Sequence, residues 1–145
     1  MNPTIEISFK TAQAYNAMCK PLCQELKLPQ TAFDILMFLA NNPDCTTARD
    51  IVEIRKIKAN LVSVNVDRLV QEGYLLRQPA PGDRRKCRLV CTEKAGPVVQ
   101  QGRELQETFF RRLARGLEPE DLAAFRRCLE GFRRNLSQMT QEDAQ

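Results

Sequence analysis

The 145-residue sequence contains no histidine, and this absence removes both the commonest general base and the commonest transition-metal ligand of proteins. The sequence also lacks a glycine-rich phosphate-binding loop. Six cysteines are present, but no two of them have Cys-x-x-Cys spacing. These absences argue against an enzyme, a metal site and a bound cofactor. We therefore expect a protein that acts by binding, with none of the three.

Long hydrophobic runs are also missing. The longest apolar stretch, Ile35 to Ala40, is far shorter than the roughly 20 residues that a membrane-spanning helix needs. The first residues, MNPTIEISFK, lack the basic-then-apolar pattern of a signal peptide. Reduced thiols are the rule in the cytosol, so six unpaired cysteines are compatible with it. The sequence predicts a cytoplasmic protein with no membrane partner, and its length fits one domain.

Positive charge is concentrated in one place. The whole chain has a net charge of +4. The segment Arg77 to Arg88 holds five basic residues and one acid, so it accounts for the entire excess. Four of the basic residues fall between Arg84 and Arg88, directly after a Pro-Gly pair. A mildly basic chain permits a nucleic-acid partner but does not require one, and a run of charge is often a solvated face.

Apolar residues recur at helical spacing in four segments before this basic cluster. The first predicted helix contains Pro21, which is expected to kink or break it. Thr46 or Thr47, followed by Asp50, predicts the N-cap of the third helix, and Gly73 is expected to end the fourth. The predicted helices cover residues 5–26, 29–40, about 47–54 and about 59–72.

The period then changes to that of a β-hairpin. The runs 74–78 and 86–91 predict two short strands, with Cys87, Leu89 and Cys91 on one face of the second. The segment 79–83 between them predicts a turn that does not continue a strand.

Two further helices are predicted after the hairpin. The first covers residues 93–115, is capped by Thr92 and is broken by Gly116. The second opens near Pro119 and carries a heptad-like apolar seam that favours packing against another helix. The seam consists of Leu122, Phe125, Leu129, Phe132 and Leu136.

This order of elements describes a winged helix-turn-helix, so the fold class is mostly α (α+β). The major groove of B-DNA is about 12 Å wide and admits one helix, which here is the helix after the tight turn, about 59–72. The hairpin, or wing, would place its cations on the phosphates or in the minor groove.

The stretches DRLVQEGYLLRQ (67–78) and DRRKCRLVCTEKA (83–95) closely resemble the wing region of the MarR (multiple antibiotic resistance regulator) family. The resemblance extends over nearly the whole chain. It implies a single domain, 1–145, with a DNA-binding core at 28–92 and dimerisation helices at 1–27 and 93–145. It further implies a homodimeric transcriptional regulator that binds a pseudo-palindromic DNA operator. We expect a repressor that a small-molecule ligand releases.

The resemblance assigns the wing motif to Asp83 and Arg85, the latter expected in the minor groove, and it places Ser63 where the family contacts DNA. The sequence departs from the family at Lys58 and Val64, where many members have Ser and Arg. Several polar or basic residues of the third helix, the fourth helix and the wing are in position to reach bases or phosphates. Arg68 and Asp67 could equally tie the fourth helix to the wing. The expected DNA-binding residues are Thr46, Thr47, Arg49, Lys58, Asn60, Ser63, Val64, Asn65, Arg68, Asp83, Arg84, Arg85 and Lys86.

The family resemblance also implies a pocket for a small aromatic effector. Its candidate lining residues, which could equally be ordinary core, are Tyr15, Met18, Cys19, Phe33, Met37 and Phe109. One alternative is thiol-based redox sensing through Cys19 or Cys23, against the simpler role of small core side chains. An alternative from another class is a winged-helix protein-interaction module that does not bind DNA.

Overall fold

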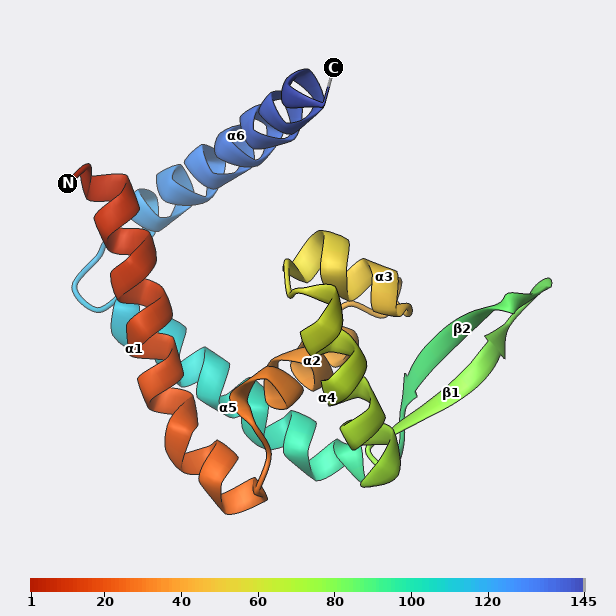
Figure 1. Cartoon of the computed structure of the whole chain (residues 1–145). Helices are drawn as coiled ribbons and strands as arrows, with labels where there is room; N and C mark the ends of the chain where they lie inside the picture. The colour runs from red at the N-terminus through yellow and green to blue at the C-terminus, as the bar shows by residue number, and fades with distance from the viewer. Residues whose placement is uncertain (145) are drawn as a thin grey trace. The chain divides into compact units, whose positions relative to one another are not determined.

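The computed structural model describes residues 1–144, and the chain divides into two compact units, residues 1–109 and residues 110 onward. The elements follow the predicted order (Figure 1). They are α1 (Pro3–Leu26), α2 (Gln30–Asn41), α3 (Ala48–Asp50), the π-helical segment η1 (Ile51–Arg55), α4 (Ala59–Gln71), β1 (Leu75–Ala80), β2 (Asp83–Cys91), α5 (Ala95–Leu113) and α6 (Pro119–Asp143). The mostly helical winged helix-turn-helix is therefore confirmed. Within residues 1–144, none of the helices combines the length and apolar character needed to cross a membrane.

Helix α1 begins earlier than predicted and is not broken at Pro21. Its start is fixed by Asn2, whose side-chain Oδ1 accepts a hydrogen bond from the Thr4 amide at 2.8 Å, and Pro3 occupies the first turn. Pro21 lies inside the helix, which continues to Leu26, so of the expected kink or break the break is wrong. Both Pro21 and Ala17 are exposed, so water can hydrate the carbonyl that loses its amide donor.

Helix α2 is the centre of the core of residues 1–109. Seven of its side chains are buried, which explains why the segment reads as an almost continuous apolar run. Three of them, Phe33, Leu36 and Met37, are at most 2% exposed. The side chains of α4 that pack in the same core are Val62, Val66 and Leu69.

The short helix before the turn begins with the predicted cap. The Thr47 hydroxyl accepts from the Asp50 amide at 3.1 Å, while the Asp50 carboxylate accepts from the Thr47 amide at 3.1 Å. This reciprocal pair is a capping box, as the sequence predicted. After one turn the backbone becomes π-helical, and Lys56, with φ of 63°, ends it in the left-handed region.

The hairpin is longer than predicted. β1 and β2 pair antiparallel from Leu75 opposite Cys91 to Pro79 opposite Cys87. The prediction that Pro79 and Ala80 belong to a turn is wrong, because Pro is tolerated in an exposed edge strand. The turn is confined to Pro81 and Gly82, and the positive φ of 81° at Gly82 is the conformation that glycine tolerates best.

The pairing of β1 with β2 is irregular near the tip of the hairpin, where the basic residues of the wing lie. Pro79 is opposite Cys87, but the next residue, Ala80, is opposite Asp83. The register shift leaves Arg84, Arg85 and Lys86 of β2 without an opposing residue in β1. This bulge frees the three basic side chains from the pairing pattern of the sheet.

The base of the hairpin is anchored to the core. Leu75 and Leu89 are buried, which confirms the predicted inner position of Leu89, and the Leu89 amide donates to the Thr46 carbonyl at 2.7 Å. Thr92 was expected to cap the next helix. Its hydroxyl instead donates to the Gly73 carbonyl at 2.6 Å and thereby joins the two ends of the wing.

The remaining helices agree with the prediction in outline. α5 ends at Leu113, two residues earlier than expected, and Gly116, with φ of 82°, lies in the connection that follows. α6 begins at Pro119, as predicted.

A close approach between α5 and α2 at Gly102 offers a test of packing. A Cβ added to Gly102 of α5 would lie 2.8 Å from Met37 Cε and 3.2 Å from Phe33 Cζ, both in buried side chains. We expect Gly102→Ala to lower the free energy of unfolding by about 1–3 kcal/mol, because the added methyl group would overpack the core. Urea denaturation measures the change.

Gly96→Ala in the same helix is the matched control, since nothing lies within 4 Å of its added Cβ. We expect it to leave stability unchanged or to raise it by about 0.5 kcal/mol. Equal effects of the two substitutions would contradict this packing of α5 on α2.

Candidate nucleic-acid interface

The wing presents cations that the protein does not neutralise. Arg84, Arg85 and Lys86 are exposed, and within residues 1–144 none of them forms an ion pair. The Asp83 carboxylate accepts a hydrogen bond from the Arg85 amide at 2.9 Å, as Asp commonly does in turns. Asp83 therefore has a local structural use, and its negative charge would repel a phosphate. In Figure 1 the hairpin extends away from the helices of residues 1–109.

Helix α4 presents a polar outer face beside the wing. Lys58, Asn60, Ser63 and Val64 are exposed, as contact with a base or a phosphate requires. Asn65 is different, because it is only 7% exposed and its amide nitrogen donates to the Leu61 carbonyl at 2.8 Å. It lies on the same buried face as Val62, Val66 and Leu69, so the expectation that it reaches bases is corrected.

Two charged residues of α4 hold the helix in place. Asp67 forms an ion pair with Arg77 of β1, so it ties α4 to the wing, which was one of the two roles expected for it. Arg68 donates to the Lys27 carbonyl at 2.9 Å and lies 3.4 Å from the Glu72 carboxylate. Arg68 thus ties α4 to the end of α1 and not to the wing.

The start of α3 differs from the expected phosphate site. The amides of Thr46 and Thr47 both donate to the Asp50 carboxylate, at 2.9 and 3.1 Å. These amides already have an acceptor inside the protein, which argues against the expected phosphate contact through them. Partial burial acts to raise the pKa of Asp50, but the hydrogen bonds from Thr47 and Thr46 prevail and lower it. Arg49 remains available, because its 2.7 Å ion pair with Glu53 is largely exposed.

The third helix, the fourth helix and the wing meet at one face. A hollow of about 260 Å³ lies between them, and its lining includes Arg49, Ser63 and Arg77 together with Cys87 of β2. Arg49 and Ser63 of the helix-turn-helix therefore border the same depression as the inner end of the wing. This arrangement places side chains from all three elements where a single ligand could contact them.

Of the six residues expected to line an effector pocket, three are buried in the core and three are half-buried. Cys19, Phe33 and Met37 are at most 2% exposed, and Met18 is half-buried. Tyr15 and Phe109 pack edge to face, with ring centroids 5.4 Å apart and planes at 72°. A cavity of about 210 Å³ adjoins two of the six. It is lined by Tyr15, Asp34, Met37, Phe38, Asn41, Asn42, Arg55 and Gln106.

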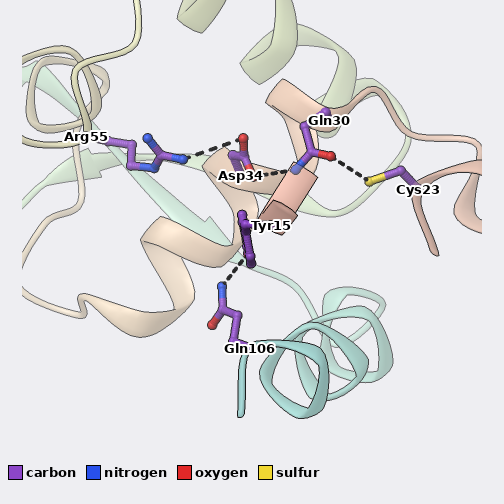
Figure 2. A network of polar contacts seen from close by, with 6 residues as sticks. All are labelled: Tyr15, Cys23, Gln30, Asp34, Arg55 and Gln106. Carbon is purple, nitrogen blue, oxygen red and sulfur yellow. Dashed lines mark hydrogen bonds and ion pairs between the residues drawn. The ribbon is translucent and has the colours of Figure 1, made fainter. Parts of the chain in front are cut away.

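The polar residues around this cavity were missed by sequence reasoning. The Gln30 amide donates to the Asp34 carboxylate at 2.9 Å, and Arg55 of η1 lies 3.6 Å from the same carboxylate (Figure 2). Separately, Gln106 of α5 donates to the Tyr15 hydroxyl at 3.0 Å. The available signal was Asp34 itself, a carboxylate inside the apolar run of α2.

Burial also raises the pKa values of a phenol and two thiols near α2. It raises the pKa of Tyr15 to about 12, so this phenol stays neutral at physiological pH. Burial likewise raises the pKa of Cys19, and that of Cys23 to about 11. Both thiols are therefore protonated near neutral pH, which opposes nucleophilic reactivity. The alternative of redox sensing gains no support from them.

Comparison with known proteins finds a family model that matches the winged helix-turn-helix part of the chain. The family model described as MarR family matches residues 26–86, from the end of α1 to the tip of the wing. No match was found among curated proteins. The match confirms, for this segment, the resemblance that the wing motif predicted.

Solved structures share the fold over almost the whole chain. The transcriptional regulator SlyA is 21% identical, with a TM-score of 0.81 over 95% of this chain and 96% of that one. Apo wild-type MarR from E. coli is 18% identical, with a TM-score of 0.70 over 91% and 98%. A MarR-family regulator from Listeria monocytogenes, solved with a 26mer DNA, is 17% identical, with a TM-score of 0.83 over 95% and 91%. At these identities the likeness shows the fold.

The buried carboxyl of α2 gives a pH prediction. Burial, opposed by Gln30 and Arg55, raises the pKa of Asp34 above 3.8. A raised pKa means that the neutral carboxyl stabilises the fold below pH 3.8 and that this contribution is lost as the pH rises through the folded value. We therefore expect Asp34→Asn, which cannot ionise, to gain stability relative to the wild type as the pH rises to neutral.

Urea denaturation of both proteins across that range measures the difference in unfolding free energy. Asp44→Asn, at an exposed site between α2 and α3, controls for the loss of one negative charge. A free energy of unfolding of Asp34→Asn that falls relative to that of the wild type as the pH rises would contradict the assignment.

Proposed function

We propose that this chain, whose DNA-binding part matches the MarR family, is a homodimeric, sequence-specific DNA-binding regulator of transcription. The observation that carries the proposal is the set of unpaired wing cations beside the exposed face of α4. A free guanidinium or ammonium group beside a groove-sized helix fits a polyanionic duplex. The MarR-family regulator from Listeria monocytogenes, which shares this fold, was solved with a 26mer DNA.

The proposed contacts are assigned to exposed side chains whose functional groups are not already held by other parts of the protein. Asn60, Ser63 and Val64 would enter the major groove, where Val64 suits a thymine methyl group. Arg85 would enter the minor groove, with its neighbours on phosphates. Asn65, Arg68 and Asp83 are left out because their polar groups are used inside the protein. The remaining contacts are proposed for Arg49, Lys58, Arg84 and Lys86.

The homodimer is supported by apolar surface that a lone chain leaves in water. In α6 the seam residues Phe125, Leu129, Phe132 and Leu136 are between 43% and 59% exposed. In α1, Ile5, Ile7 and Phe9 are at least half exposed. We propose that a second copy covers these faces. Two-fold symmetry then implies a pseudo-palindromic operator with half-sites about one helical turn apart.

The regulatory output is proposed as repression that a small ligand relieves. A bound dimer would occlude the promoter. A ligand that changes the spacing of the two α4 helices would prevent both from entering successive major grooves. A winged-helix module that binds protein instead of DNA is the outcome that the binding experiments below would reveal.

The wing contact is tested by the salt dependence of DNA binding. We expect Arg85→Ala to weaken binding to every fragment bound in a genomic mobility-shift screen, and to shallow the slope of log K against log salt by about one. Arg85→Lys should keep the slope but bind more weakly, because an ammonium lacks the planar fork of donors.

Arg126→Ala on α6 is the matched control, because it removes an exposed arginine outside the wing, and we expect it to leave the slope unchanged. A slope unaffected by Arg85→Ala would argue against a phosphate or minor-groove contact. Absence of saturable, sequence-selective binding by the wild type, even at low salt, would overturn the proposed function.

The dimer is tested by placing a charge in the seam. We expect Leu129→Glu to weaken self-association at least about a hundredfold, because an unpaired charge would be buried between the two copies. Arg127→Glu changes a neighbouring position away from the seam and should leave the dimer intact. Sedimentation velocity reads both. A monomeric wild type, or a Leu129→Glu variant that dimerises normally, would refute the proposal.

A further inference from the structure

The exposed face of α4 carries two apolar side chains. Leu61 is 43% exposed and Val64 is 67% exposed, although the opposite face of the same helix already supplies the core with Val62, Val66 and Leu69. The two lie three residues apart, so they are neighbours on the helix surface and are offset by about 4.5 Å along its axis. Packing in the core therefore does not account for their apolar character.

The same helix offers no free side chain that favours guanine. Guanine is bound most often by an arginine or a lysine that contacts its O6 and N7 atoms. Arg68 is the arginine of α4, and its guanidinium donates to the Lys27 carbonyl at 2.9 Å and lies 3.4 Å from the Glu72 carboxylate. Lys58 precedes the helix as its N-cap. The cation within α4 that could bind guanine is therefore already held by the protein.

The acidic residue of the exposed face is also engaged. A carboxylate favours cytosine, whose amino group donates in the major groove. Asp67 instead forms an ion pair with Arg77 of β1. Asn60 and Ser63 are exposed and remain available. Because an asparagine amide forms paired hydrogen bonds with adenine, and serine suits several bases, the polar groups left on this face favour adenine.

An apolar pair on such a face fits thymine. Thymine presents its C5-methyl group in the major groove, where apolar side chains contact it. Successive bases are about 3.4 Å apart along a strand, close to the offset between Leu61 and Val64. The exposed cations Arg84, Arg85 and Lys86 of the neighbouring wing form no ion pair within residues 1–144, so the occupant of this face is polyanionic.

We propose that Leu61 and Val64 recognise the methyl groups of thymines on neighbouring base pairs, with Asn60 on an adenine, so that α4 selects A·T pairs. This inference rests on the proposed function and adds the bases that the helix recognises. Leu61 was not among the residues that the sequence led us to expect at the DNA. Its role is to determine specificity through an apolar contact, whereas the wing cations supply affinity for any duplex.

Uracil interference with the full-length protein tests these contacts. A duplex that the wild type selects from a random-sequence library is amplified with a small proportion of dUTP, which replaces single thymines by uracil and removes only the methyl group. Mobility shift separates bound from free DNA, and cleavage after treatment with uracil-DNA glycosylase locates each uracil. We expect two neighbouring thymines in each half-site at which uracil weakens binding about fourfold.

Leu61→Ser and Val64→Ser each remove one of the two apolar contacts. We expect each variant to lose the uracil effect at one thymine and to keep it at the other, because serine has no methyl group to place there. Neither variant should change the slope of log K against log salt, in contrast to Arg85→Ala, since no charge is lost. Leu76→Ser is the matched control, because Leu76 is 51% exposed on β1, and it should keep both uracil effects.

Val64→Arg tests the preference by reversing it. This variant puts at position 64 the residue that many members of the MarR family have, and its guanidinium is free to bind O6 and N7 of guanine. Selection from the same library should therefore yield a G·C pair where the wild type takes an A·T pair. Circular dichroism verifies that each variant is folded.

The inference is overturned if uracil leaves binding unaltered at every thymine, or if the wild type selects guanine under α4. It is also overturned if Leu61→Ser and Val64→Ser keep the full wild-type pattern of uracil effects, or if Leu76→Ser loses it. In all of these cases a duplex is still selected and bound, so the proposed function stands. Failure of the wild type to select any duplex would overturn the proposed function and this inference with it.

Discussion

The anchoring of the hairpin to the core is the constraint on which the proposed DNA-binding surface depends. Leu75 and Leu89 are buried at the base of the two strands, and the Leu89 amide is bonded to the Thr46 carbonyl just before α3. The Asp67–Arg77 ion pair adds a link from α4 to β1. Together these contacts fix the base of the wing relative to α4. The wing cations and α4 are therefore placed where they could contact the same ligand.

The charged groups of this chain fall into two classes, those that form hydrogen bonds or ion pairs within the protein and those that do not. Arg68, Arg77 and Asp50 are engaged in hydrogen bonds or ion pairs that position helices and strands. The wing bulge, in contrast, holds Arg84, Arg85 and Lys86, none of which forms an ion pair within residues 1–144. Arg55 lies between these cases, since it touches one carboxylate at 3.6 Å and no more within the described chain. A charged group whose hydrogen-bond donors have no partner inside the protein is available to bind a ligand, whereas a fully paired group has a structural role.

The sequence predicted the elements well where burial imposed a period, and poorly where a single polar contact decided the outcome. The apolar run of α2 and the repeat of α4 follow directly from their buried faces. Polarity suggested that Asn65 faces DNA, but its spacing of three residues from Val62 and four from Leu69 places it on the buried face of α4. There its amide donates to the Leu61 carbonyl. Strand β1 continues through Pro79 because its edge is open, which composition alone does not reveal.

The cavity was out of reach of sequence reasoning for a similar reason. Asp34 and Arg55 lie on different elements, and only the packing of η1 against α2 brings them together. Of the six residues expected to line a pocket, Cys19, Phe33 and Met37 are buried in the core.

The central claim, that α4 and the wing hold one duplex and do so twice per dimer, is tested most directly by footprinting a selected genomic fragment. Dimethyl sulfate reports guanines covered in the major groove, and hydroxyl radicals report the sugars along the minor groove. The account predicts two major-groove protections about one helical turn apart, each flanked by minor-groove protection from a wing. Protection in a single groove, or at a single half-site, would contradict it.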